Sequence, residues 1–538
     1  MHFPRLTLRI HLILLLSYAL FTVGLIMLPV LLAGFPYKLT WLILAARQFE
    51  RSGMMPANST PLLVYVISWL HPLIRWDDMV GWTAVSAAFF AASLFPWWWT
   101  IRRLFDVRVA WLSTVLLSFL PQYWQEVIEF SGYAPALFFL FLGFAFYVSL
   151  RDRHHLAAVM AVGLCMGAVV ATNHAFITFP PWLLVSYLWQ GRKQTARALG
   201  AAALACICGI VIFILPLLPI ALRPGLSTGA RISAILPSGA TPGVGHLYPD
   251  RYTYDFLRAE YDARLQLEMQ HASFLERQAN ENYGIIFGAL KTGFITSVSN
   301  GLWLFVNVLP SFFFEETVGG IFLWLFIVPG IVVLWRERRV LLLQLGGLWL
   351  WIEFCVRFLL HFGRAHLNDI AWMLALFAAV GIASAVTAIV RQRTSLRPAL
   401  LMAGVLFVSA VQLLQANRTT LAKRYTRSDV PLIYAATNAL HSVPSNAVVA
   451  HPRKDDLFFF SPQTSVSLHP DTIDYLSKLG RLREPFAHYG IQYILGYNPG
   501  QTQNILAAVP GIRVVPLPDP PPPVPLTELS RYLLNLTR

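Results

Sequence analysis

Charged residues are scarce in this chain: only 13% of its 538 residues are Asp, Glu, Lys or Arg, whereas 56% are hydrophobic. A soluble fold of this length cannot bury so much apolar material. The apolar residues also come in blocks of about 18 to 25, the length that crosses about 30 Å of hydrocarbon at 1.5 Å per residue. The composition therefore excludes an ordinary soluble protein and predicts a polytopic membrane protein.

Cysteine is also rare, and all four cysteines lie inside the apolar blocks, at Cys165, Cys206, Cys208 and Cys355. This placement implies neither a disulfide framework nor a zinc site. Cys206 and Cys208 are expected to be small core residues of one helix. The sequence also lacks a Walker loop, a dinucleotide-binding glycine motif, a zinc-protease helix and a serine-hydrolase elbow. Function must therefore be sought among polar residues near a membrane face.

The predicted fold class is an all-α polytopic membrane protein with about eleven transmembrane helices and a small C-terminal soluble α/β domain. The first apolar block is too long for a signal-peptide core and is expected to stay as a membrane anchor. The predicted domains are a transmembrane module, 1–415, and an exported-side domain, 416–538. The predicted spans are 10–33, 80–99, 109–121, 135–150, 155–172, 176–190, 198–222, 317–335, 340–360, 370–390 and 398–415.

Lys and Arg fall in every second connection between these spans, which predicts the orientation because short cytoplasmic loops are enriched in them. The N-terminus is therefore expected in the cytoplasm and the tail on the opposite, exported side. The basic residues are Arg5, Arg9, Arg102, Arg103, Arg108, Arg151, Arg153, Arg192, Lys193, Arg197, Arg336, Arg338, Arg339, Arg391, Arg393 and Arg397. The net charge of +14 then reflects topology, and no nucleic-acid partner is expected.

Three predicted exported segments, 34–79, 223–316 and 416–538, are too long to be simple turns. In the first, an interfacial helix is expected from Pro36 to Arg51, and a second helix from Pro61 after the cap Thr60. In the second, the apolar stretch 283–310 is interpreted as an interfacial or re-entrant helix pair, because a crossing there would reverse the charge pattern. In the tail, helices are predicted at 430–441 and 471–482 and strands at 447–450, 491–495 and 512–515.

Two groups of ionisable residues near the exported face are candidates for chemistry. Glu353 and Arg357, four apart on the ninth span, can form an ion pair that either packs helices or lines a phosphate pocket. Beyond them, Arg364 can hold an anion near the start of the tenth helix, where free amides and the helix dipole favour negative charge. His361, His366 and Asp369 lie in the same connection, and snorkelling interfacial charges are the alternative.

The connection after the third span carries Glu126 and Glu129, followed by Ser131, Gly132 and Tyr133. Paired carboxylates can act as base and acid or bind a divalent metal, and a solvated loop edge is the alternative. The other polar candidates either border a cavity expected beneath the first exported loop or are ordinary surface and structural residues. They are Lys38, Arg47, Glu50, Arg51, Asp77, Asp78 and His174.

Several stretches together resemble the GT-C superfamily, the multi-span glycosyltransferases that use polyprenyl-phosphate donors, and within it the protein O-mannosyltransferase and aminoarabinose transferase group. No single stretch is specific, although together they cover most of the chain. They are FPYKLTWLILAARQFERSGMMP with STPLLVYVISWL in the first exported loop, RRLFDVRVAWLSTVLLSFLP, SGYAPALFFLFLGFAFYVSLR, GRAHLNDIAWMLALFAAVGIASA and the tail segment HYGIQYILGY.

The resemblance implies a glycosyltransferase that moves a sugar from a polyprenyl-phosphate donor to a glycan, lipid or protein acceptor. It implies catalytic roles for Glu126, Glu129 or Glu50. The residues it implies for substrate binding are Arg364, Arg47, Arg357, Glu353, Lys38, Tyr133, His174 and His366. No cofactor is certain, and a divalent metal ion is a further candidate. The expected location is the bacterial inner membrane.

The chain departs from the family pattern in its first exported loop, which leaves a catalytic and a non-catalytic role open. The first exported loop of this family opens with a catalytic aspartate, but the chain has Ala33, Gly34, Phe35, Pro36, Tyr37 and Lys38 there. Another glutamate replaces it, or the protein is a non-catalytic scaffold subunit with membrane-protein partners. A lipid or solute transporter is the third hypothesis, although paired broken helices are not evident.

Overall fold

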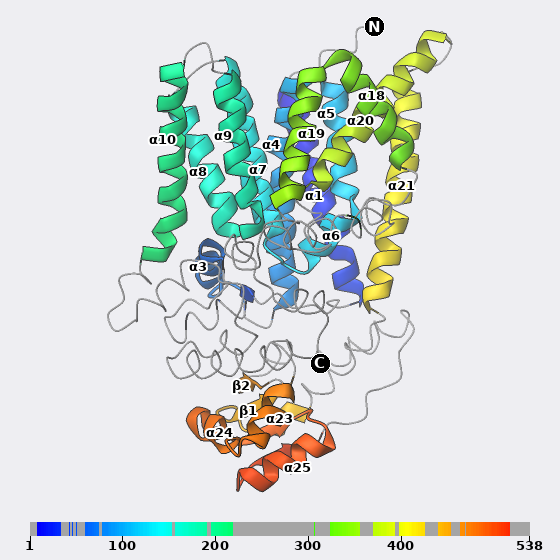
Figure 1. Cartoon of the computed structure of the whole chain (residues 1–538). Helices are drawn as coiled ribbons and strands as arrows, with labels where there is room; N and C mark the ends of the chain where they lie inside the picture. The colour runs from blue at the N-terminus through cyan, green and yellow to red at the C-terminus, as the bar shows by residue number, and fades with distance from the viewer. Residues whose placement is uncertain are drawn as a thin grey trace.

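The structure is a computed structural model of the chain, drawn in Figure 1. It describes residues 8–33, 42, 43, 46, 50, 60–74, 78–152, 156–190, 195–218, 306, 323–355, 370–392, 398–425, 439–452, 463–468 and 470–516. The predictions for 223–316 and for Arg47, Lys38, Arg357, Arg364 and His366 lie outside these residues.

A helix is present at each of the eleven predicted positions: α1 (Leu8–Ala33), α4 (Met79–Leu104), α5 (Val107–Phe119), α7 (Tyr133–Asp152), α8 (Leu156–Thr172), α9 (Phe179–Gln190), α10 (Thr195–Ile214), α18 (Trp324–Glu337), α19 (Arg339–Glu353), α20 (Ala371–Gln392) and α21 (Pro398–Tyr425). Among the described residues, four helices are long and apolar enough to cross a membrane by length and composition: the segments Leu8–Leu31, Val80–Leu104, Ala371–Arg391 and Leu400–Arg418. The largely helical fold of a membrane protein is thereby confirmed.

The helices pack into one bundle around a shared apolar core. α4 contacts α1, α5 and α7, and α20 contacts α5, α18 and α21. The largest buried side chains are aromatic, among them Trp82, Trp97, Trp98, Tyr123 and Phe141. Large rigid rings fill the space between these helices because they bury much area with few rotatable bonds.

Glycines bring two helix pairs into backbone contact. A Cβ atom on Gly167 of α8 would lie 2.2 Å from the carbonyl oxygen of Gly209 on α10. A Cβ atom on Gly330 of α18 would lie 1.9 Å from the carbonyl oxygen of Phe377 on α20. Small residues at such spacing allow close helix approach in membranes, where burial of apolar surface gives no drive to associate.

The bundle has two distinct ends (Figure 1). The beginning of α1, the ends of α4, α18 and α20, and the beginnings of α5, α19 and α21 lie together at one end, called here the basic end. The short helices α3 (Pro61–Leu70) and α6 (Pro121–Ile128) lie toward the other end. The described basic turns thus share one end, as the charge pattern predicts.

Residues 439–516 contain a four-stranded parallel sheet in the order β2-β1-β3-β4. Its strands are β1 (Val448–His451), β2 (Thr464–Ser467), β3 (Tyr493–Leu495) and β4 (Arg513–Val515). The helices α23 (Pro470–Lys478), α24 (Arg483–Tyr489) and α25 (Pro499–Ala508) provide the apolar partners of this sheet. The predicted strands correspond to β1, β3 and β4, whereas β2, α24 and α25 were not predicted.

Three predictions need correction. Cys206 is exposed on α10, because this helix contacts α8 and α9 with one side only, so it is not a core residue. Helix α21 continues to Tyr425, past the predicted end at residue 415. The connection after α5 is not a loop edge, because α6 follows immediately and buries Glu129, which is 4% exposed.

Candidate active site

The short helix α6 sets the position of the predicted carboxylates. It begins with Pro121 at its first position, where a missing N–H costs no hydrogen bond. The preceding turn is held by two side chains, since Trp124 Nε1 donates to the Ser118 carbonyl at 2.6 Å and Asn417 Nδ2 donates to the Phe119 carbonyl at 2.8 Å. α6 therefore starts at a fixed place between α5 and α21.

Glu129 caps the C-terminal end of α6, where the chain reverses into α7. Phe130 follows with a φ of 52° and Gly132 has a φ of 84°, both in the left-handed region. For a residue with a large side chain such as Phe130 this conformation is unfavourable and persists only where surrounding contacts impose it. Phe130 is held by an edge-to-face contact with Trp82, with ring centroids 5.8 Å apart. The reversal is thus a constrained turn that fixes Glu129.

Glu129 and Glu126 differ in their surroundings. Glu129 is buried, whereas Glu126 is partly exposed. The Glu126 carbonyl accepts two bonds, from the Ser131 backbone N–H at 3.2 Å and from the Ser131 hydroxyl at 3.1 Å. A buried carboxylate is costly and needs compensating interactions, so Glu129 is the stronger candidate for a chemical role.

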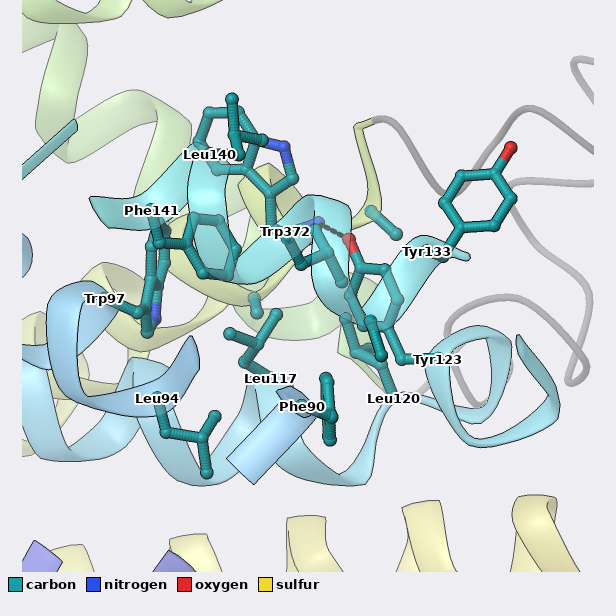
Figure 2. Packing of buried hydrophobic residues seen from close by; sticks show 14 of the residues in the cluster. Phe90, Leu94, Trp97, Leu117, Leu120, Tyr123, Tyr133, Leu140, Phe141 and Trp372 are labelled. Atoms are coloured by element: carbon teal, nitrogen blue, oxygen red, sulfur yellow. Dashed lines mark hydrogen bonds between the residues drawn. The ribbon is translucent and has the colours of Figure 1, made fainter. Parts of the chain in front are cut away.

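Tyr133 begins α7 directly after this turn. Its ring packs edge-to-face on Phe176 of the 3-10 helix η1 (His174–Thr178), with centroids 5.7 Å apart. In Figure 2 the Tyr133 hydroxyl points away from the packed aromatic group. The candidate residue His174 therefore begins a 3-10 helix that supports Tyr133 through Phe176.

Glu353 ends α19 and is buried, with 4% of its surface exposed. Two residues earlier, Trp351 Nε1 donates to the Thr178 carbonyl of η1 at 2.8 Å. The end of α19 is thereby tied to the same 3-10 helix that packs on Tyr133.

Sequence analysis did not single out Tyr123, which links α6 to α20. Its hydroxyl oxygen accepts the backbone N–H of Trp372 at 2.9 Å (Figure 2). Trp372 is the second residue of α20 and also contacts Trp97 and Phe144, at centroid distances of 5.6 and 5.4 Å. The chain between Glu353 and Trp372 contains Arg357, Arg364 and His366. This segment is therefore attached at both of its described ends to elements that surround Glu129 and Tyr133.

Glu50 is the third predicted catalytic carboxylate. Its Oε1 lies 3.1 Å from Nδ1 of His71, just after α3, and both side chains are 32% exposed. Helix α3 starts at Pro61 after Thr60, as predicted, but the Thr60 side chain makes no capping hydrogen bond. Glu50 thus contacts a histidine just after α3, and Leu63 of α3 packs against Gly132 in the α6–α7 turn.

No group of three or more His, Cys, Asp or Glu side chains suited to a metal ion occurs within the described part of the chain. Glu126 and Glu129 can supply two carboxylates, and the divalent metal ion stays a prediction.

Three solved structures resemble the whole chain. The Archaeoglobus fulgidus oligosaccharyltransferase in its apo form is 13% identical with a TM-score of 0.54, covering 94% of this chain and 72% of that one. The same organism's oligosaccharyltransferase AglB, in complex with an inhibitory peptide and a dolichol-phosphate, is 13% identical with a TM-score of 0.52, covering 89% and 69%. ArnT from Cupriavidus metallidurans, bound to undecaprenyl phosphate, is 14% identical with a TM-score of 0.52, covering 94% and 89%.

The chain shares the overall fold of these oligosaccharyltransferase and ArnT structures. The predicted resemblance is thereby confirmed at the level of fold. No protein-family model matches the chain, and no curated protein sequence matches it. At 13 to 14% identity, the similarity concerns the arrangement of the helices.

Among the described residues two glutamates are buried, Glu129 at the α6–α7 turn and Glu353 at the end of α19. The expected loop aspartate is absent from the segment between Ala33 and Lys38. Glu129 was predicted, but its burial was not, because burial depends on α6 packing under α4 and α21. The Pro121 that starts a new helix was the available signal for α6.

Proposed function

We propose that the chain is a membrane glycosyltransferase that transfers a sugar from a polyprenyl-phosphate donor to a glycan, lipid or protein acceptor at the exported face. The observation that carries this proposal is the buried Glu129, fixed at the α6–α7 turn of a GT-C fold. Arg357 and Arg364 precede α20 in the sequence, and α20 is bonded to α6 through Trp372 and Tyr123.

The proposed reaction inverts the sugar at its anomeric carbon. The acceptor hydroxyl attacks that carbon, and its proton passes to the carboxylate of Glu129 or Glu126. The bond from the anomeric carbon to the phosphate oxygen breaks, and polyprenyl phosphate leaves with the electron pair. Arg364, assisted by Arg47 or Arg357, stabilises the departing phosphate, because a fixed cation favours the charge that develops there.

An apolar cavity supports a lipid-linked donor. It has a volume of about 300 Å³ and lies between α8, α9 and α10, lined by residues such as Val162, Met166 and Leu183. Ile177 of η1 lines it as well, while the neighbouring Phe176 packs on Tyr133. The apolar lining of this cavity suits the hydrocarbon chain of a polyprenyl donor.

The two similar proteins with bound lipid phosphates support the same donor class. AglB was solved with dolichol-phosphate and ArnT with undecaprenyl phosphate. We infer that this chain uses a donor of that chemistry. We also infer that the eleven helices named above cross a bacterial inner membrane. The N-terminus is then cytoplasmic, and the sheet-bearing tail lies on the exported side.

Replacing Glu129 with Gln tests the proposal. The variant keeps the size of the side chain but removes the base, so transfer of labelled sugar from a polyprenyl-phosphate donor should fall about 10²- to 10⁴-fold. Binding of undecaprenyl phosphate, measured by native mass spectrometry, should stay unchanged. Glu126→Gln should show a smaller loss.

Glu484→Gln is the matched control, because Glu484 lies at the exposed start of α24, where it pairs with Arg481. Full transfer activity in Glu129→Gln would remove Glu129 from the mechanism.

A non-catalytic scaffold subunit is the second candidate function. One feature of the sequence favours it: the stretch from Ala33 to Lys38 lacks the carboxylate that opens the first exported loop of the resembled family. Stable co-purification with fixed membrane-protein partners, together with no turnover of any lipid-linked sugar by the unmodified chain, would support this function over the transferase.

A further inference from the structure

A cluster of arginines lies at the basic end, where the α4–α5 turn meets the α18–α19 turn. The two turns are far apart in sequence but in direct contact, since Arg338 Nη1 donates to the Leu104 carbonyl at 2.5 Å. The Arg338 guanidinium also lies over the Phe105 ring, 5.0 Å from its centroid. Arg338 therefore brings its charge to the end of α4, whose last turn also carries Arg102 and Arg103.

Aromatic rings lie against Arg102, Arg338 and Arg339. Arg102 lies 5.2 Å from the Trp98 ring centroid, and Arg339 lies 4.3 Å from the Trp335 ring centroid. Within the described residues, no carboxylate oxygen lies within 4.0 Å of Arg102, Arg338 or Arg339. A guanidinium stacked on a ring keeps N–H donors available for an anion.

Two acids lie in these turns, Asp106 before α5 and the exposed Glu337 at the end of α18. Asp106 caps α5 by accepting the Val109 backbone N–H at 2.8 Å. In addition, α19 begins at Arg339, and the side chain of its cap residue Arg338 makes no capping hydrogen bond. The first amides of this helix therefore add to the positive potential.

An apolar stripe leads from this cluster along the bundle. Leu325, Val328, Val332 and Trp335 are exposed on α18 at intervals of three, four and three residues, so they share one face. This stripe ends at Trp335, under the Arg339 guanidinium. A cationic group at the end of an exposed apolar track matches a molecule with an anionic head and an apolar chain.

We propose that the junction of the α4–α5 and α18–α19 turns binds the phosphodiester head group of an anionic phospholipid, whose acyl chain lies along the α18 stripe. The site is separate from the α6–α7 turn and does not depend on the transfer reaction. A free phosphate ion shares the head-group chemistry, but the stripe favours the lipid.

The test is native mass spectrometry of the purified full-length chain with phosphatidylglycerol and phosphatidylcholine. The unmodified protein should retain phosphatidylglycerol in preference to phosphatidylcholine. The Arg338→Gln, Arg339→Gln double variant should lose that preference by roughly 25-fold, since each arginine that pairs with the bound head group contributes roughly fivefold in affinity. Arg339→Gln alone, which leaves the contact of Arg338 with Leu104 intact, should lose roughly fivefold.

Arg391→Gln is the matched control, because Arg391 is an exposed arginine at the same end, in the last turn of α20. It should keep the preference for phosphatidylglycerol. An unchanged preference in the double variant, or an equal loss in Arg391→Gln, would overturn the site. Displacement of phosphatidylglycerol by millimolar inorganic phosphate would show a phosphate site instead of a lipid site.

Discussion

At the residue scale, Gly132 is the position where backbone conformation and packing both exclude a side chain. Its φ is 84°, and a Cβ atom there would lie 3.1 Å from Leu63 Cδ2 and 3.2 Å from the Thr172 carbonyl oxygen. Gly132→Ala should destabilise the fold by about 1 to 3 kcal/mol, measured as a lower thermal midpoint in detergent. Transfer activity should fall as well, because the same turn fixes Glu129.

Gly404→Ala on α21 is the control, since a Cβ atom there meets nothing within 4 Å. It should not lower the midpoint, because alanine favours a helix over glycine by about 1 kcal/mol. An equal loss in both variants would contradict the packing argument.

The sequence predicts which residue types gather at the site but not how each is used. Glu126, Glu129 and Tyr133 are evident as a polar group between two apolar blocks. The burial of Glu129 follows from contacts with residues distant in sequence, as does the bond between Tyr123 and Trp372, 249 positions apart. Such pairings are set by tertiary packing, which local patterns do not contain.

At the element scale, the α8–α10 pair depends on glycine. Gly167→Val should push α10 away from α8, because the new Cβ would lie 2.2 Å from the Gly209 carbonyl oxygen. The thermal midpoint should drop by the equivalent of about 2 kcal/mol or more. Gly200→Val on α10, where a Cβ atom meets nothing within 4 Å, should leave it nearly unchanged. Similar midpoints for the two variants would mean that α8 and α10 do not pack as described.

In the sheet-bearing region, Tyr497 should make stability depend on alkaline pH. Burial raises the pKa of Tyr497 well above its usual value, and its hydroxyl donates to the Leu468 carbonyl at 3.0 Å. The neutral form is favoured in the folded state, so the stabilisation is complete below the unfolded pKa of about 10 and is lost as pH rises above it. Hydrogen exchange of residues 463–516 should therefore accelerate above about pH 10.

Tyr497→Phe is the comparison for this effect. It removes both the hydrogen bond and the ionisable group, so exchange should be somewhat faster at neutral pH but should change less above pH 10. An alkaline response as steep as that of the unmodified chain would assign the effect to another group.

Long apolar helices were predictable because hydropathy and length alone define them, as for α1, α4 and α20. The short strand β2 was not, since only Val466 among its four residues is apolar, and it exists by pairing in parallel with β1. The helices α24 and α25 are also short, at 7 and 10 residues, and owe their stability to the sheet they cover.

At the scale of the whole molecule, the arginine-bearing ends of α4, α18 and α20 lie at one end of the bundle, and α3 and α6 lie toward the other (Figure 1). If short basic loops face the cytoplasm, the Glu129 turn and the tail face the exported side. A polyprenyl-linked sugar presented there would reach Glu129 without crossing the bilayer.

Sidedness of labelling tests this arrangement most directly. In a chain whose four cysteines are replaced by Ser, single-cysteine variants Leu479→Cys in the tail and Arg391→Cys at the basic end are treated in intact cells with a membrane-impermeant maleimide. Both positions are exposed in the folded chain, so accessibility depends on the side of the membrane. The account predicts labelling of Leu479→Cys and protection of Arg391→Cys until the cells are opened; equal labelling of the two in intact cells would contradict it.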